Sequence, residues 1–220
     1  MTENAANTSR TTPPSGGTGT ALGFGARCMR FIRDRRGVAA VEFALVAPLL
    51  LTLYFVTMEV AQGIETNKKI GRVGSMVADL ITQQQTMNPD ELDAIMEIGS
   101  SILKPYNRSN PKVYITAIQV DDDEDNPTAK VVWSRKLVND ATSNYLAPGT
   151  TATIPTKLMT PGSFLIRVSS ELDYSPVITW SAPDTPAWGV AAIFDGIKMA
   201  EIYYLRPRMS NTIPCADCNG

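Results

Sequence analysis

The longest apolar run of the chain covers residues 38–58. Its clearly polar members are Glu42, Thr52 and Thr57. An α-helix rises about 1.5 Å per residue, so a helix of this length spans roughly 30 Å, the thickness of the hydrocarbon core of a bilayer. The pattern therefore predicts one transmembrane helix over residues 38–58.

Apolar residues continue at three- and four-residue steps after this segment: Val60, Ile64, Val73, Met76, Val77, Leu80 and Ile81. Lysine and arginine side chains lie between them, which is typical of an amphipathic helix. We expect one long helix from about residue 38 to 85. Gly63, Gly71 and Gly74 are expected to weaken it locally, because glycine is a poor helix former.

A second helix has well-marked ends. Asn88 can cap it, Pro89 suits its first position, and Glu91 completes an N-x-x-E capping box. Its apolar face follows at Leu92, Ile95, Met96, Ile102 and Leu103. We expect Pro105 to end this helix, because proline cannot continue the backbone hydrogen bonding.

From Pro111 onward the pattern changes to that of strands. Residues 112–120 and 129–137 are rich in β-branched and aromatic side chains. The acidic segment 121–128 lies between them and supplies the turn. An antiparallel hairpin is the natural prediction.

The remaining strands are less sharply marked. A third strand is predicted over 163–174, and 191–205 fits either a further strand or a helix. Residues 138–160 are turn-rich and are expected to form a loop or short helix that covers the sheet. The fold class is therefore α+β: an N-terminal transmembrane helix that continues as an amphipathic helix, a second helix, and then an antiparallel β-sheet.

Charge is distributed unevenly, although the net charge is only −2. In residues 1–37, six arginines against Glu3 and Asp34 give +4, so the rest of the chain carries −6. The positive-inside rule places this head in the cytoplasm and residues 59–220 outside. The head lacks periodicity and is rich in Thr, Gly, Ser and Pro, so we expect it to be disordered. The small net charge suggests no nucleic-acid partner.

Three other export signals fit the segment less well. A secretory signal peptide has a shorter apolar core and ends at a small-x-small site, which "TMEVAQG" does not provide. A lipoprotein signal at Cys28 lacks an apolar run before the cysteine. A twin-arginine signal at Arg35 and Arg36 is disfavoured because an apolar run containing a glutamate follows almost at once.

The residues at the start of the apolar run resemble a processing site. "RRGVAAVEF" is similar to the sites cut by prepilin peptidases, with Gly37 before the scissile bond and a glutamate fifth in the mature chain. Cleavage there would make Val38 the first residue and Glu42 the fifth. Phe43 stands where Flp-type pilins usually have tyrosine. The stretches "GVAAVEFALVAPLLLTLYF" and "YLRPRMSNTIPC" resemble TadE-like and TadG-like minor pilins or pseudopilins of the tight-adherence system.

Glu42 is an ionisable group inside the apolar run. A carboxylate near the end of such a helix costs about 1–3 kcal/mol, so something should offset it. The resemblance implies that the partner is the new amino group of a neighbouring subunit. The alternative is that Glu42 lies near the headgroups or is protonated. Pro48, in the same helix, either shapes subunit packing or is an ordinary tolerated transmembrane proline.

The domain after the membrane segment offers little catalytic chemistry. The chain has no histidine, which removes the usual general base and the commonest metal ligand. It also has no P-loop, G-x-G-x-x-G or G-x-S-x-G motif. The acidic run 121–125 has oxygen ligands of the kind that calcium binds, but it lacks EF-hand spacing and fits a solvated turn better. We therefore expect no enzymatic activity, no cofactor and no metal.

The three cysteines divide by compartment. Cys28 lies on the predicted cytoplasmic side, whereas Cys215 and Cys218 lie in the segment predicted to be outside, where disulfides form. An intrachain disulfide between Cys215 and Cys218 is favoured over a free or intermolecular pair and over a redox site. A set of aromatic residues in the C-terminal half is expected to pack in the core, with a binding surface as the alternative: Tyr174, Trp180, Trp188, Phe194, Tyr203 and Tyr204.

Together these features indicate a single-pass protein of the bacterial inner membrane. Its N-terminus is expected in the cytoplasm and residues 59–220 in the periplasm. The resemblance implies a minor pilin or pseudopilin that takes part in tight-adherence pilus assembly. It implies that prepilin peptidase cuts between Gly37 and Val38, and that Glu42 and Phe43 dock against other subunits. The alternative is an uncleaved, membrane-anchored periplasmic scaffold or binding protein.

Overall fold

The computed structural model describes residues 37–103, 108–176 and 196–218. They form two helices, one short 3-10 helix and a five-stranded sheet: α2 (Val38–Thr82), α3 (Pro89–Ser101), β1 (Lys112–Val120), β2 (Ala129–Val138), β3 (Ala141–Asn144), η2 (Thr156–Leu158), β4 (Phe164–Asp173) and β5 (Lys198–Leu205). Helices precede an antiparallel sheet, so the predicted α+β class is confirmed. The expectation of a disordered head lies outside the described residues.

The chain divides into two compact units after Leu51. The described part of the first unit is the beginning of α2. The second unit contains the rest of α2, α3 and all five strands. Every side-chain contact described below for the folded domain lies within this second unit.

The two helices follow the sequence signals closely. α2 extends to Thr82, near the predicted end at about 85. In α3, the Asn88 side chain accepts a hydrogen bond from the backbone N–H of Glu91 at 2.9 Å, and the Glu91 carboxylate accepts one from the Asn88 N–H at 3.1 Å. The predicted capping box is thus confirmed. α3 ends at Ser101, while the predicted stop at Pro105 lies outside the described residues.

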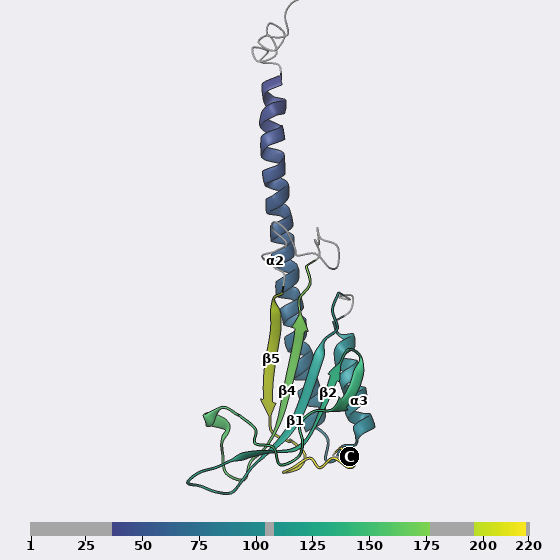
Figure 1. Cartoon of the computed structure of the whole chain (residues 1–220), viewed down its shortest axis with the longest axis vertical. Coiled ribbons are helices and arrows are strands. Elements are labelled where there is room, and N and C mark those ends of the chain that lie inside the picture. The colour runs from purple at the N-terminus through teal and green to yellow at the C-terminus, as the bar shows by residue number, and fades with distance from the viewer. Residues whose placement is uncertain (1–36, 104–107, 177–195, 219–220) are drawn as a thin grey trace, which may run out of the picture. The chain divides into compact units, whose positions relative to one another are not determined.

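The strands lie in the order β3-β2-β1-β4-β5, and every neighbouring pair is antiparallel. Figure 1 shows β5, β4, β1 and β2 following one another across the sheet. The predicted hairpin is β1 with β2, and the predicted third strand is β4. The described part of 191–205 contains the strand β5 and no helix. β3 lies in the segment predicted to be a loop.

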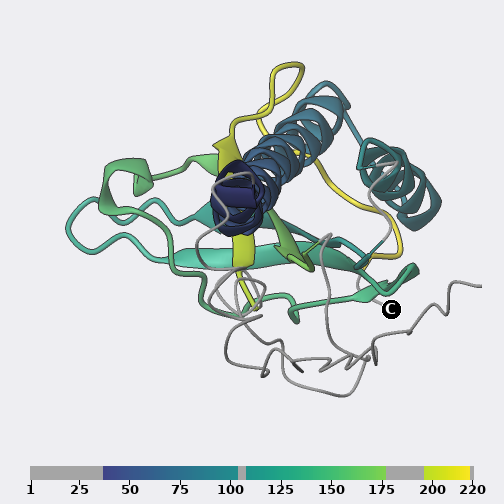
Figure 2. The same cartoon turned by 90° about the horizontal axis from the view of Figure 1, so that it is seen from above.

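The main core lies between the helices and one face of the sheet. Figure 2 shows α3 and the C-terminal part of α2 on the same side of the sheet. The helices and strands contribute buried side chains to one cluster: Ile70, Val73, Val77, Ile81, Leu92, Met96, Val113, Ile115, Trp133, Leu137, Ile166 and Val168. Burial of these side chains is the main force that holds the helices against the sheet.

A bulge in β2 changes which face of the sheet its side chains point to. Ala117 faces Trp133 and its neighbour Ile118 faces Val131, so Val132 is left over between the two pairs. Trp133 therefore belongs to the main core while Val131 belongs to a second cluster on the other face. The loop after β3 and the η2 turn cover that cluster, as expected for 138–160. The covering side chains include Leu146, Ala152, Ile154 and Leu158.

The glycines of α2 permit close packing and do not break the helix. α2 continues through Gly63, Gly71 and Gly74. A Cβ on Gly74 would lie 2.8 Å from Cδ2 of Tyr203 and 2.9 Å from Oγ of Ser170. That Oγ donates a buried hydrogen bond to the Ile70 carbonyl at 2.9 Å, so the helix backbone lies directly on the sheet. The local weakening expected from these glycines is therefore not seen as a break.

The described members of the aromatic set pack against the cores. Tyr174 is 3% exposed and belongs to the main cluster. Tyr203 packs against the main cluster and Tyr204 against the second one. The expectations for Trp180, Trp188 and Phe194 fall outside the described residues.

Candidate functional site

The first half of α2 is apolar on all its sides. Its large apolar side chains are exposed around the helix: Val38, Val41, Phe43, Leu45, Val46, Leu49, Leu50, Leu51, Leu53, Tyr54 and Phe55. α2 is long and apolar enough to cross a membrane, and none of its most apolar window is buried in the protein. A helix that is apolar all round fits lipid better than a single protein face.

Polar groups inside this apolar segment are few. The Thr57 hydroxyl donates to the carbonyl of Leu53 at 2.8 Å, which satisfies it within the helix. Pro48 lies inside α2, and the helix continues through it. Glu42 is exposed, and none of the described residues forms a hydrogen bond or ion pair with its carboxylate. Glu42 is therefore the ionisable group of this segment whose charge no described residue offsets.

The predicted processing residues lie at the beginning of α2. Gly37 directly precedes the helix, and both Gly37 and Val38 are exposed. A Cβ added to Gly37 would meet no atom within 4 Å. Packing therefore does not explain why a glycine stands here. Phe43, the residue predicted to dock with Glu42, is 71% exposed and available for contact with another helix or with lipid.

The helix residue Glu59 is turned into the folded domain. It is 3% exposed, and its Oε1 accepts a hydrogen bond from the Tyr174 hydroxyl at 2.6 Å. The two residues are 115 positions apart, so no local pattern indicated the contact. This bond ties the residues that directly follow the apolar segment to the end of β4.

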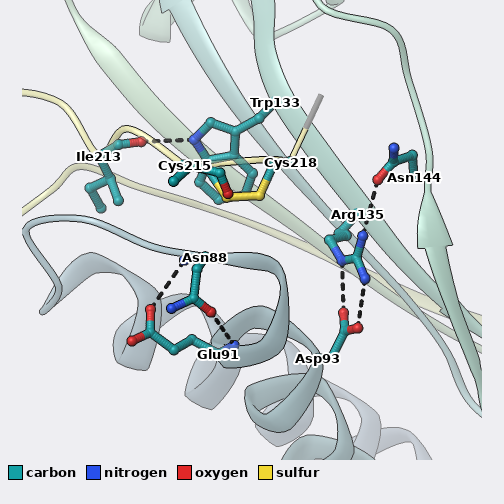
Figure 3. Close-up of a disulfide and its surroundings, with 10 residues drawn as sticks. Asn88, Glu91, Asp93, Trp133, Arg135, Asn144, Ile213, Cys215 and Cys218 are labelled. Atoms are coloured by element: carbon teal, nitrogen blue, oxygen red, sulfur yellow. Dashed lines mark hydrogen bonds and ion pairs between the residues drawn. A yellow bond between two sulfur atoms is a disulfide. The ribbon is translucent and has the colours of Figure 1, made fainter. Parts of the chain in front are cut away.

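The C-terminal residues form a docked tail. Met87, between the two helices, donates its N–H to the Pro214 carbonyl at 2.9 Å and accepts the N–H of Ala216 at 3.0 Å. The indole N–H of Trp133 donates to the Ile213 carbonyl at 2.7 Å. Figure 3 shows this bond beside the tail. Ile213 is fully buried, so the tail is part of the core.

The structure contains a disulfide between Cys215 and Cys218, the pair that the sequence favours. Their Cα atoms lie 5.6 Å apart. Cys218 is 2% exposed and belongs to the main cluster, while Cys215 packs against it. Figure 3 shows the bond next to Trp133. Cys218 is buried and Cys215 is half-buried in the docked tail, an arrangement that fits a structural disulfide.

A partly buried ion pair joins α3 to the sheet. Arg135 donates from Nε and Nη2 to the two carboxylate oxygens of Asp93 at 2.7 and 2.6 Å, and Thr142 donates to Asp93 at 2.8 Å. Figure 3 shows the Arg135 guanidinium between Asp93 and Asn144. Burial alone would raise the pKa of Asp93. The hydrogen bonds and charge of Arg135, together with the Thr142 bond, outweigh it, and the pKa of Asp93 lies below its ordinary value.

The acidic turn between β1 and β2 is organised by its own hydrogen bonds. Asp121 accepts bonds from the backbone and the hydroxyl of Thr128, and these bonds lower the pKa of Asp121. Asp123 accepts the N–H groups of Asp125 and Asn126 at 3.0 and 3.1 Å. Across the described ranges, no three His, Cys, Asp or Glu side chains are grouped so that they could hold a metal ion.

Residues 37–69 match the family model of TadE-like protein. The resemblance seen in the sequence is thereby confirmed for this segment, and the match is consistent with the TadE-like proteins of tight-adherence pilus systems. The TadE-like segment begins at Gly37, contains Glu42 and Phe43, and continues past Glu59. No curated protein and no solved structure matches the chain.

Proposed function

We propose that this chain is a minor pilin or pseudopilin that takes part in assembly of a tight-adherence, Flp-type pilus. It acts through contacts between subunits and performs no chemical reaction. The observation that carries the proposal is the TadE-like match over residues 37–69, because it covers the apolar segment together with the predicted cleavage position and Glu42.

The proposed topology follows from the same segment. The apolar part of α2 anchors the protein in the bacterial inner membrane. The arginine-rich head lies in the cytoplasm, and residues 59–220 lie in the periplasm. A disulfide between Cys215 and Cys218 suits an oxidising compartment.

Processing by prepilin peptidase is proposed at the bond between Gly37 and Val38. Both residues are exposed and Gly37 has no packing role, so a size limit there fits recognition by a peptidase. N-terminal sequencing of the membrane form should give Val38 as its first residue. Gly37→Leu should block the cut and leave membrane insertion intact, whereas Gly63→Ala, on the same helix beyond the cut, should be processed normally. An N-terminus at Met1 or Thr2 in the wild type would favour the uncleaved scaffold.

Glu42 is proposed to pair with the new amino group of a neighbouring mature subunit. An ion pair would offset the cost of a lone carboxylate in the apolar helix. Glu42→Ala should therefore insert and be cut as the wild type is, but the mature protein should accumulate in the membrane and fail to support pili. Glu42→Asp should be intermediate because its reach is shorter.

Glu65 provides a matched control for this experiment. It is a glutamate on the same helix that pairs with Lys69 at 3.0 Å, outside the predicted span. Glu65→Ala should leave piliation unchanged, because surface ion pairs of this kind contribute little. Wild-type piliation by Glu42→Ala would show that the carboxylate has no docking role.

A further inference from the structure

A small surface where α2 leaves its apolar segment combines apolar and basic side chains. Val60, Ile64 and Ile197 are 42%, 53% and 40% exposed. Ile64 and Ile197 line one open groove together with Lys68 and Lys198. Val60 lies one helical turn before Ile64 on the same helix face. We call these five residues the junction patch.

The patch continues the apolar segment along the helix. Val60, Ile64 and Lys68 follow one another at four-residue steps, so they form one row on α2. Ile64 lies about 9 Å along the helix axis beyond Met58, the last residue of the predicted span. This distance places Ile64 close to the interfacial layer that borders the hydrocarbon core. Side chains of a helix lean toward its N-terminus, which here is the membrane side. Ile64 and Lys68 therefore extend back toward the bilayer.

The second part of the patch comes from the beginning of β5. Figure 1 shows β5 running in the same direction as the neighbouring part of α2. Ile197 and Lys198 thus lie beside the earlier residues of that part of the helix, as the shared groove also shows. Further along β5, Ile202 is 55% exposed but lies about 16 Å away along the strand.

Three carboxylates near the patch, Glu59, Glu65 and Asp173, are withdrawn or paired. Glu59 is 3% exposed and bonded to Tyr174. Glu65 is engaged by Lys69 at 3.0 Å. Asp173 lies opposite Lys198 in the sheet and accepts the Lys112 ammonium at 2.7 Å. Glu201 lines a second groove together with Lys68. Within the described ranges no ion pair links Lys68 or Lys198 to a carboxylate. The patch therefore presents apolar side chains bordered by two lysines that no ion pair of the described residues holds, which suits an anionic phospholipid surface.

The small exposed apolar area of the patch favours lipid over a protein as its binding partner. Three partly exposed aliphatic side chains fall far short of the roughly 800 Å² that each partner of a stable protein interface buries. A lipid contact needs no such area, because the adjoining helix already holds the chain at the membrane. Lysines at the border can extend their ammonium groups to phosphates while their stems cover apolar surface.

We propose that the junction patch seats the folded domain on the interfacial layer of an anionic phospholipid bilayer. Val60, Ile64 and Ile197 enter the layer, and Lys68 and Lys198 contact headgroup phosphates. The proposal rests on the membrane anchoring described under the proposed function. It goes further, because anchoring by α2 alone does not require any part of β5 to touch lipid.

Site-directed fluorescence in vesicles tests the proposal. The full chain carries Cys28→Ser and one added cysteine in place of Tyr54, Ile64, Ile197 or Ile202, with the Cys215–Cys218 disulfide kept oxidised. Each cysteine is labelled with an environment-sensitive nitrobenzoxadiazole dye. The proteins are reconstituted into phosphatidylethanolamine and phosphatidylglycerol vesicles that contain headgroup-nitroxide lipids as quenchers.

The label at Tyr54 reports on anchoring alone, and Ile202 is the matched exposed control on β5. Labels at Tyr54, Ile64 and Ile197 should all be shielded from water, and the latter two should be quenched strongly by headgroup nitroxides. Ile202 should not be quenched. Shielding at Tyr54 without quenching at Ile197 would overturn the seat and leave the anchor intact. Loss of shielding at Tyr54 would overturn both the seat and the anchor. Quenching at Ile202 as strong as at Ile197 would show that the domain contacts lipid non-specifically.

The lysines provide a second readout. Lys68→Gln and Lys198→Gln should each lower the equilibrium constant for docking of the Ile197 label by about fivefold in anionic vesicles. Added salt should weaken the wild-type contact in the same direction. Quenching of the Ile197 label that is unchanged by both substitutions and by salt would overturn the role assigned to the lysines.

Discussion

Replacing Gly74 with alanine is expected to destabilise the folded domain, whereas the same change at Gly63 is expected to stabilise it. Both glycines lie in α2, and alanine favours a helix over glycine by about 0.5–1 kcal/mol. At Gly63 the nearest atom to an added Cβ is Cζ of Tyr174 at 4.0 Å, an ordinary contact. Gly63→Ala should therefore gain about the full helix-propensity term.

At Gly74 the added methyl group meets the sheet. The distances of 2.8 Å to the Tyr203 ring and 2.9 Å to the Ser170 hydroxyl are too short, so one of these groups must move. Overpacking of this kind costs about 1–3 kcal/mol. The helix-propensity gain is common to both variants and cancels, so Gly74→Ala should be less stable than Gly63→Ala by about 1–3 kcal/mol. For a chain of this size that is a difference of roughly 2–12 °C in Tm.

Urea unfolding of the full chain in mild detergent, followed by near-ultraviolet circular dichroism, measures the difference. The midpoints should separate while the slopes stay equal. Tyr203→Ala removes the nearest obstacle, so Gly74→Ala should cost less in that background. Equal midpoints for Gly63→Ala and Gly74→Ala would refute the close approach of helix and sheet.

Three other predictions concern the folded domain. Asp93→Asn should cost about 1–3 kcal/mol at neutral pH by weakening the Arg135 contact. The pKa of Asp93 is lowered in the folded state from its ordinary 3.8, so this contribution is present above pH 3.8 and is lost as the pH falls through the lower folded-state pKa. In an acid titration of stability, the variant should therefore lose less than the wild type. Cys215→Ser should speed hydrogen exchange of the amides that join the tail to the α2–α3 loop. It should lower the free energy of unfolding by at most about 2 kcal/mol, because the closed loop is short. Cys28→Ser should change neither the exchange rate nor the stability. Tyr174→Phe removes a hydrogen bond to a buried carboxyl group and should cost about 1–3 kcal/mol in urea unfolding; an unchanged midpoint would contradict the buried contact.

Local signals predicted much of this fold. The Asn88 cap and Glu91 act over three residues, so the sequence alone places the start of α3. The hairpin of β1 and β2 is likewise a contact between neighbours in sequence. β3 was missed because it has only four residues, most of them exposed, and it lacks the apolar alternation that marks a strand.

Contacts between distant residues could not be predicted from the sequence. The Trp133 bond to Ile213 joins residues 80 positions apart, and the sequence around either residue gives no sign of the other. The bulge at Val132 shifts the apolar pattern of β2 from one face to the other, which a strict period of two does not reveal. The roles proposed for Gly37 and Glu42 come from a short motif, whereas the lipid contact proposed for Ile197 depends on tertiary packing that the sequence does not indicate.

The docked tail also governs when the domain can fold. Ile213 fills the main core, and Ala216 completes the backbone bonds to Met87. Both lie well over a hundred residues after α2, so they leave the ribosome late, and under the proposed topology they would also leave the export channel late. The helices and hairpin emerge first and must wait, with part of their apolar surface uncovered, until the tail arrives. Under the proposed topology, completion of the core would follow translocation, and truncated or stalled chains would lack the closure that protects them from proteases.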